Sequence, residues 1–389
     1  MERRIHSTRI VEHFQDINDP RIERNKLHKL VDILVLTILG TLCGCEGWEE
    51  IELYGQEKEG WLRKFLDLAN GIPSHDTIRR VFLRLKPEEL HRCFLSWVEA
   101  LRVATAGEIV SIDGKTVRRS GDAQKGLAPL HLVSAWSHEN RLVLGQVRTE
   151  AGSNEITAIP ELLELLELKG CILTIDAIGC QKEIARKIKK EKKADYVLAV
   201  KANQPKLLEE ITWFFQDLDL VVDVQEGLAE HTHTVDKDHG RREIRDYYIS
   251  GEISWLIPEL TGWEGVKSIG MVISQRIIGK KKSVQKRYYL CSTAADSQLF
   301  ARAVRSHWGI ENSVHWVLDV GFREDESRVR TDASPENLAI LRKIALNLVR
   351  RDTSGKLSLK QRRRKAGWSD EYLEKLLFTP DSSFPPRAR

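Results

Sequence analysis

Between residues 108 and 215, strand-like and helix-like segments follow one another in an order that few folds share. Three strand-like runs come first, and helical segments then alternate with two compact apolar runs; the five runs are residues 108–113, 131–136, 142–149, 171–176 and 194–200. Strands joined by short turns pair antiparallel, whereas strands separated by a helix pair in parallel. The order β-β-β-α-β-α-β-α therefore predicts an α/β fold with a ribonuclease H-like catalytic core rather than a Rossmann fold. No glycine-rich phosphate loop follows any of these runs, which weakens a nucleotide-binding interpretation.

The segments on either side of this core have a different pattern. Residues 1–105 read as several short helices, which predicts a small helical N-terminal domain. The run Thr77-Ile78-Arg79-Arg80 suits a DNA-docking bundle, and a packing or dimerisation domain is the alternative. Alternation after residue 220 predicts a β-rich insertion, with strands at 241–249, 266–276 and 283–292. The predicted division is a helical domain at 1–105, the core at 106–220 and 297–350, the insertion at 221–296 and a basic C-terminal tail at 351–389.

The basic residues are concentrated, although the net charge is only +4. Residues 276–287 and 356–365 each carry six Lys or Arg side chains and no acid. Such runs often contact phosphates, and a solvated loop or tail is the alternative. The six cysteines lack the spacing of a metal site, so reduced thiols in a cytoplasmic protein are expected. The apolar run 33–45 is shorter than the roughly 20 residues that span a bilayer, which predicts a buried helix and no membrane partner.

Two aspartates stand at the ends of apolar runs. Asp113 is expected at the C-terminal end of the first strand, where Gly114 lets a backbone or ligand approach closely, and Asp176 ends the fourth strand. If those strands are neighbours, the two carboxylates converge at one edge of the sheet. Without a cation they would repel each other and the pKa of one would rise. Mg²⁺ and Mn²⁺ prefer oxygen ligands, so the pair predicts a site for two such ions; a turn or cap residue is the alternative for either Asp alone.

A third acid is harder to choose. His307, Glu311 and His315 recur at helical spacing within the helix expected at 300–320, so they share one face. Glu311 could complete the metal shell, and four acids compete with it: Asp319, Glu324, Asp325 and Glu326. A zinc site made of His307, Glu311 and His315 is disfavoured because three ligands on successive turns of one helix cannot easily surround one ion. Trp308 could stack on an unpaired base, with a place in the core as the alternative.

Five motifs along the chain resemble those of the H-repeat-associated insertion-sequence transposases of bacteria, which are members of the DDE transposase superfamily. In order, they are IDGKTVR, TIDAIGCQKEIA, YVLAVKANQPKL, HGRREIR and RSHWGIENSVHWVLDVGFREDESR. The similarity continues through the N-terminal HKLVDILVLTILGTLCGCEGWEEIE and NGIPSHDTIRRVF, so it covers about residues 10–375. The resemblance implies that Asp113, Asp176 and Glu311 are the catalytic and metal-binding triad. It also implies a transposase that cuts element ends and joins them to target DNA by two-metal phosphoryl transfer.

The resemblance also bears on the DNA contacts. Related transposases often carry a Tyr and an Arg before the Glu and a Lys after it, where this chain has Val304, His307 and Leu318. DNA contacts are therefore predicted at Lys115, Arg118, Lys201, Arg241, Arg242, Arg305 and His307. For the arginines of the insertion, salt bridges with Glu243 and Asp246 are the alternative. The implied partners are double-stranded DNA, comprising terminal inverted repeats and target, and a second copy of the chain. Two other functions stay open, a nuclease without strand transfer and a catalytically silent DNA-binding protein.

Overall fold

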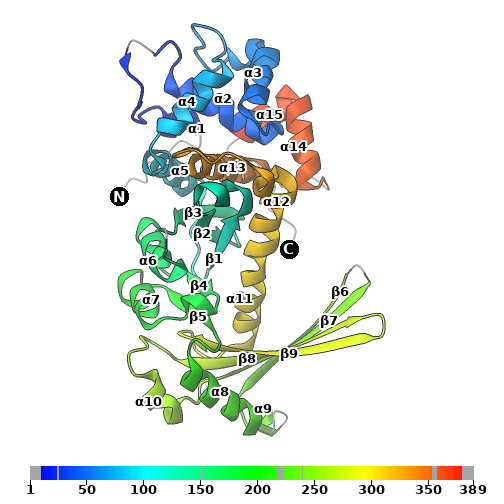
Figure 1. Cartoon of the computed structure of the whole chain (residues 1–389). Coiled ribbons are helices and arrows are strands. Elements are labelled where there is room, and N and C mark those ends of the chain that lie inside the picture. Colours follow the sequence, from blue (N-terminus) through cyan, green and yellow to red (C-terminus); the bar gives the residue numbers. More distant parts are fainter. Residues whose placement is uncertain are drawn as a thin grey trace, which may run out of the picture.

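The structure, a computed structural model, describes residues 10–23, 26–150, 152–217, 222–238, 240–352 and 357–378. Helices from both ends of the chain gather at one end of the molecule, and a mixed sheet extends from them to the other end (Figure 1). The strands are β1 Ile109–Val117, β2 Leu130–Ser137, β3 Leu142–Arg148, β4 Ile172–Ile175, β5 Asp195–Val200, β6 Glu230–Asp238, β7 Arg241–Ser250, β8 Ser268–Ile278 and β9 Lys281–Cys291. They form a nine-stranded sheet in the order β3-β2-β1-β4-β5-β9-β8-β7-β6.

The first and fourth strands are neighbours, as the segment order predicted. β1 pairs in parallel with β4, and β4 in parallel with β5, while β1, β2 and β3 pair antiparallel. One expectation was wrong, because Asp113 does not end its strand. The parallel ladder with β4 stops at Ile112 opposite Ile175, but the antiparallel ladder with β2 continues to Val117. Asp113 therefore lies inside β1 at the point where its parallel neighbour ends.

The insertion extends the same sheet instead of forming a separate one. β9 pairs antiparallel with β5, from Val197 opposite Cys291 to Val200 opposite Tyr288. Strands β7, β8 and β9 lie where alternation predicted strands. β6 was not predicted, because this outer strand reads EHTHTVDKD and carries polar residues on both faces. An outermost strand needs no continuous apolar side, so its sequence lacks the usual signal.

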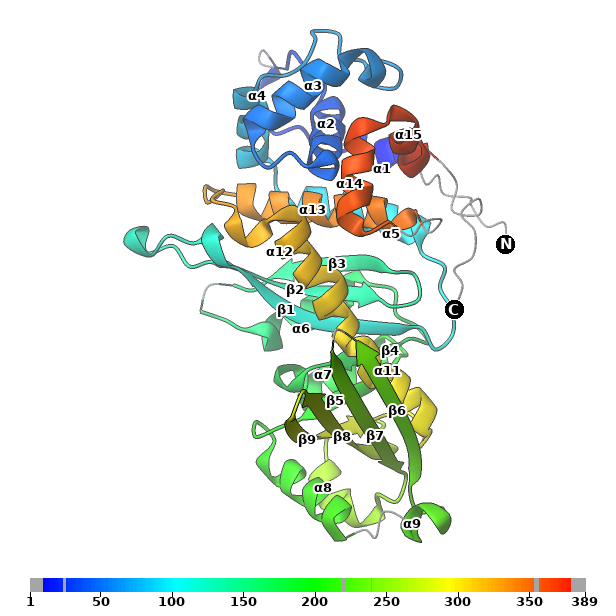
Figure 2. The ribbon, with the colours of Figure 1, turned by 90° about the vertical axis from the view of Figure 1, so that its right-hand side faces the viewer.

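Helices cover both sides of the sheet. α6 Glu155–Leu165 and α7 Lys182–Arg186 lie on one side, and α11 Ser297–Ile310 lies on the other (Figure 1). A π-helical turn, Glu311–His315, joins α11 to α12 Trp316–Phe322, so the helix expected at 300–320 is interrupted. α11 and α12 cross the strands diagonally (Figure 2). The remaining elements near the insertion are α8 Pro205–Asp217, α9 Val222–Gln225 and α10 Ile257–Leu260.

The helical end of the molecule combines helices from the first and the last part of the described chain. They include α1 Ile10–Phe14, α2 Leu30–Cys43, α3 Trp48–Leu62, α4 His75–Arg84, α5 Pro87–Leu101 and α13 Ser334–Arg351. α2 contains the apolar run and is buried along almost its whole length, as predicted. In the described part of the chain no single helix is long and apolar enough to cross a membrane. Only α2 and α3 together pass by length and composition, and they are bent by 98°.

The predicted basic C-terminal tail, residues 351–389, includes folded segments. Residues 359–378 form α14 Leu359–Trp368 and α15 Asp370–Phe378, which pack with the N-terminal helices (Figure 2). Arg363 is buried and donates to the carbonyl oxygens of Thr41 at 2.7 Å and Leu42 at 3.1 Å. Part of the basic run thus satisfies helix-end carbonyls inside the protein. Lys356, where that run begins, lies outside the described residues.

Candidate catalytic centre

β1 and β4 bring Asp113 and Asp176 to the same edge of the sheet. Each aspartate directly follows a member of the last parallel pair, Ile112 opposite Ile175. Asp176 also caps a 3-10 turn, because its Oδ1 accepts the N–H of Ile178 at 3.0 Å. The expected cap role and a place beside Asp113 therefore coexist in one residue. Both carboxylates line a cavity of about 360 Å³.

Glu311 also lines this cavity, and it is carried by the π turn that follows α11. α11 is fastened to β1 by the Ser111 hydroxyl, which donates to the carbonyl of Ser306 at 3.2 Å. Thr174 on β4 lies 3.1 Å from Nδ1 of His307 through its hydroxyl. These contacts fix the end of α11, and the following π turn then presents Glu311 to the cavity. The three predicted acids thus line one cavity although β1, β4 and the π turn lie far apart in the sequence.

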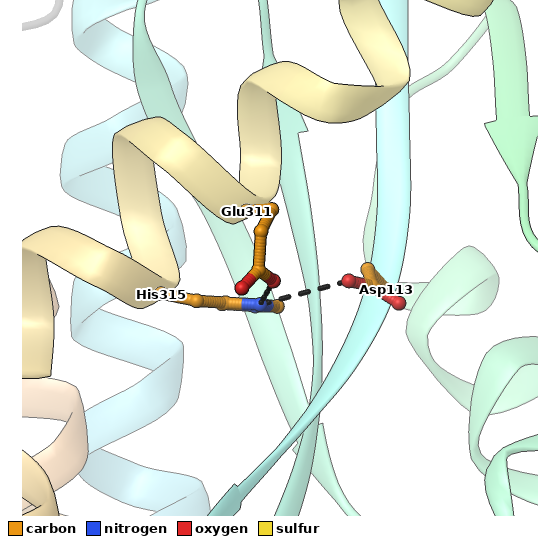
Figure 3. Close-up of side chains that lie close together, drawn as sticks. All are labelled: Asp113, Glu311 and His315. Atoms are coloured by element: carbon orange, nitrogen blue, oxygen red, sulfur yellow. Dashed lines mark hydrogen bonds and ion pairs between the residues drawn. The ribbon is translucent and has the colours of Figure 1, made fainter. Parts of the chain in front are cut away.

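His315 joins this group. Its Nδ1 lies 3.1 Å from Oε2 of Glu311 and 3.6 Å from Oδ2 of Asp113 (Figure 3). One donor atom from each of these residues falls within 4.8 Å of the other two. His307, the third member of the disfavoured zinc site, is not part of this group and faces Thr174 instead. Burial lowers the pKa of His315 against the opposing effect of Glu311.

The carboxylates around Asp113 crowd one another. Burial and then the charges of Glu155, Asp176 and Glu311 raise the pKa of Asp113 to about 7, against an opposing hydrogen bond from the backbone of Gly114. Like charges held together in a partly buried site favour a bound cation, which removes the repulsion. The donor set consists mainly of carboxylate oxygens, which suit Mg²⁺ or Mn²⁺. The residues present therefore fit a divalent cation.

Glu155 is a fourth acid that sequence reasoning missed. It lies in the first turn of α6, and its Oε1 is 3.0 Å from Nε2 of His131 on β2. A Cβ at Gly114 would overlap the Glu155 carboxylate and lie 2.8 Å from the His131 ring. Gly114 was expected to admit a backbone or ligand, and it admits these two side chains instead. The Asp-Gly pair was thus a usable signal, but it did not say what approaches the glycine.

The cavity joins an apolar floor to a basic rim. Val197, Ala199 and Tyr289 of β5 and β9 form part of its floor, and Lys201 and Arg287 also line it. The guanidinium carbon of Arg287 lies 4.8 Å from the ring centre of Trp308, and Trp308 is 43% exposed. Trp308 therefore stands at the cavity and not in the core. Lys201 and His307, both predicted DNA contacts, line the same cavity.

A second cavity of about 360 Å³ adjoins the first and shares Gln285, Arg287 and Trp308 with it. Five arginines line this second cavity, namely Arg241, Arg245, Arg276, Arg287 and Arg305. The alternative role also holds in part, because Arg241 pairs with Glu243 at 2.8 Å and Arg245 pairs with the same carboxylate. Arg305 lies 3.3 Å from Asp236. Asp246, in contrast, contacts His231 and His233. Arg242, one residue after Arg241, projects to the other face of β7.

Lys115 and Arg118 follow Asp113 along the chain and contact a separate group of acids. The Lys115 side chain is 10% exposed, and its Nζ lies 2.8 Å from Asp319, 3.1 Å from Asp325 and 3.3 Å from Glu324. It is engaged inside the protein, so this geometry gives no support to a DNA contact by Lys115. The same contacts account for three of the four acids that competed with Glu311. Arg118 is 82% exposed and lies 3.2 Å from Asp325.

Sequence comparison with known proteins identifies the family of this chain. Residues 104–348 match the family described as Transposase DDE domain, and residues 11–98 match the one described as DDE_Tnp_1-associated. "Putative transposase YncI" of Escherichia coli O157:H7 is 43% identical over 371 residues, 95% of this chain and 94% of that protein. "H repeat-associated putative transposase YhhI" of Escherichia coli K12 is 38% identical over 373 residues, 95% of this chain and 97% of that protein. "Inactive transposase YbfQ" of strain K12 is 45% identical over 73 residues, 19% of this chain and 87% of that protein. The chain therefore belongs to the DDE transposase family and carries the associated N-terminal domain of that family.

Proposed function

We propose that this protein is the transposase of a bacterial insertion sequence and that it cuts the ends of its element and joins them to target DNA. The observation that carries the proposal is the meeting of Asp113, Asp176 and Glu311 at one cavity, in a chain of the DDE family. We assign these three residues as the catalytic triad and as ligands for two Mg²⁺ or Mn²⁺ ions. We also propose that β1–β5 with their helices are a ribonuclease H-like core, because two parallel neighbours follow a three-stranded antiparallel meander.

The chain's own residues hold and orient the reacting groups. Bound divalent ions would supply Lewis acidity and neutralise charge during phosphoryl transfer. Asp113 and Asp176 stand on paired strands, so their carboxylates have fixed positions, while Glu311 closes the site from the helix. Asp113 and Asp176 are only partly exposed, which strengthens their attraction for cations relative to open solvent. Preorganised charge of this kind is the main way in which a protein promotes phosphoryl transfer.

The two adjoining cavities suggest a path for the DNA backbone. Lys201 and His307 stand nearest the acids, and the arginines of the second cavity continue from Arg287 to Arg276 along β9 and β8. Lys and Arg side chains neutralise phosphates and contribute most sequence-independent affinity. We therefore retain Lys201, Arg241, Arg305 and His307 as proposed contacts and add Arg276 and Arg287. Arg118 and Arg242, both exposed, remain proposed contacts outside these cavities.

The test uses the full chain with DNA that carries the repeats flanking its gene, a target plasmid and Mg²⁺. A transposase gives cut ends and joined products, and Asp113→Asn, Asp176→Asn and Glu311→Gln each abolish both. Cut ends without joined products would identify a nuclease. DNA binding without either reaction would identify a silent DNA-binding protein. Pairing of two ends predicts a dimer on DNA, which sedimentation of the complex would measure.

A further inference from the structure

His315 stands in the centre beside Asp113 and Glu311, and the one role considered for it from the sequence, in a zinc site with His307, was disfavoured. It is 4% exposed, and Nδ1 lies between a carboxylate of β1 and a carboxylate of the π turn, 3.6 Å from Asp113 and 3.1 Å from Glu311 (Figure 3). Glu311 is different, because 58% of its side chain is exposed. A glutamate with that much freedom adopts many rotamers unless a neighbour restrains it. The buried ring of His315 contacts Glu311 where such a restraint would act.

The π turn explains why the two side chains meet. The N–H of Trp316 bonds to the carbonyl of Glu311, five residues back, instead of four as in an α-helix. In a regular α-helix, residues four apart are offset by about 40° around the axis. The wider π turn reduces that offset, so Glu311 and His315 face Asp113 together. Single π turns are uncommon and recur at functional sites.

The surroundings of the ring decide which nitrogen carries the proton. Nε2 is buried and has no hydrogen-bond partner within the ranges that the structure describes. A proton on Nε2 would therefore be buried without an acceptor, whereas a proton on Nδ1 meets the Glu311 carboxylate. The favoured tautomer is Nδ1–H donating to Oε2 of Glu311.

We infer that His315 is a positioning residue whose Nδ1–H holds the exposed Glu311 carboxylate toward Asp113, so that both acids are ready to share a cation. The inference rests on the proposed function and assigns His315 a role beside the triad, not within it. A ligand role would require Nδ1 to present its lone pair. It would leave an Nε2–H buried without an acceptor, against the usual arrangement of metal-bound histidine.

The experiment compares substitutions that keep or remove the donor. His315→Asn keeps an N–H near the position of Nδ1, and His315→Leu removes it at similar size. His315→Phe is a second donor-free variant that keeps the ring shape should the leucine variant not fold. His233→Leu, on β6 and paired with Asp246, is the matched control. Mn²⁺ affinity is measured by titration calorimetry without DNA, and cleavage is measured against Mg²⁺ concentration.

The donor-free variants are expected to bind Mn²⁺ about tenfold more weakly and to need correspondingly more Mg²⁺ for cleavage. His315→Asn should stay within about threefold of the wild type, because it keeps the donor that orients the carboxylate. Equal Mn²⁺ affinity in the wild type and the donor-free variants would overturn the inference. So would a spin-echo signal from imidazole nitrogen directly bound to Mn²⁺, since it would make His315 a ligand. Because calorimetry needs no DNA, a wild type that binds Mn²⁺ but cuts nothing refutes the proposed transposase and still tests His315. A wild type that binds no Mn²⁺ overturns both.

Discussion

Asp113→Asn is expected to make the metal-free protein more stable, and increasingly so as the pH rises. In the folded chain the pKa of Asp113 is about 7, against an ordinary 3.8, because the residue is buried beside three other carboxylates. A raised pKa means that the folded state binds the proton more tightly than the unfolded state. Folding stability therefore falls as the pH rises from about 4 to 7 and stays low above that.

The size of the effect follows from the two pKa values. A rise from 3.8 to about 7 corresponds to at most about 4 kcal/mol at roughly 1.4 kcal/mol per pH unit. About 2.5 kcal/mol of this is lost between pH 5 and pH 8, because at pH 5 the folded acid is still protonated. Asparagine carries no charge at either pH. The advantage of Asp113→Asn over the wild type should therefore grow by up to about 2.5 kcal/mol from pH 5 to pH 8.

Urea unfolding in EDTA at pH 5, 6.5 and 8 measures this difference. Glu57→Gln, on the exposed surface of α3, is the matched control for the loss of one carboxylate. Adding Mn²⁺ at pH 8 should reverse the order, stabilising the wild type and leaving Asp113→Asn almost unchanged, because a ligand that binds only the folded state raises its stability. If the advantage of Asp113→Asn were the same at pH 5 and pH 8, the carboxylates would not crowd Asp113, and the reasoning behind the cation site would be refuted.

Three further predictions concern residues around the centre. Gly114→Ala places a methyl group on the Glu155 carboxylate, so it should destabilise the chain by about 1–3 kcal/mol in thermal unfolding. Adding Glu155→Ala should recover most of the lost stability, and no recovery would show that another contact is responsible. Arg287→Ala removes the cation over Trp308 and should weaken binding to a DNA duplex of any sequence. Fluorescence anisotropy should show that the salt dependence of binding falls by about one phosphate contact, and an unchanged salt slope would show that Arg287 does not contact the DNA. Lys115→Met removes the ammonium that pairs with the fully buried Glu324 and should destabilise the protein by about 3–5 kcal/mol. The DNA affinity of the folded protein should not change, and a selective loss of that affinity would show that Lys115 contacts the DNA.

Much of the centre could be predicted because its parts have local signals. The runs that became β4 and β5 are short, apolar and bounded by helical segments, so their parallel pairing followed from their order. Asp113 and Asp176 could be chosen as candidate metal ligands because each directly follows a buried apolar run that forms the parallel ladder. Glu311 had no such signal among its neighbouring acids, and family resemblance chose it. The competing acids proved to be engaged elsewhere, three of them around Lys115.

Other features had no local signal. Sequence periodicity predicts a continuous helix through residue 320, but packing against β1 and β4 accompanies a π turn at Glu311–His315. Glu155 reads as an ordinary acid in the first turn of a helix, and only the return of α6 over Gly114 brings it beside Asp113. Arg363 reads as part of a solvated basic run, yet it is buried against carbonyls of a helix some 320 residues earlier.

By itself, the sequence determined the order of strands and helices and singled out the two aspartates that follow the parallel ladder, because apolar periodicity is a property of neighbouring residues. Only the tertiary structure decided which other groups surround those aspartates. Glu155 and His315 come beside Asp113 from separate elements, and Lys115 turns away into a buried ion-pair group. Such contacts depend on how helices cross the sheet, and that crossing is set by packing across the whole chain instead of by any one segment.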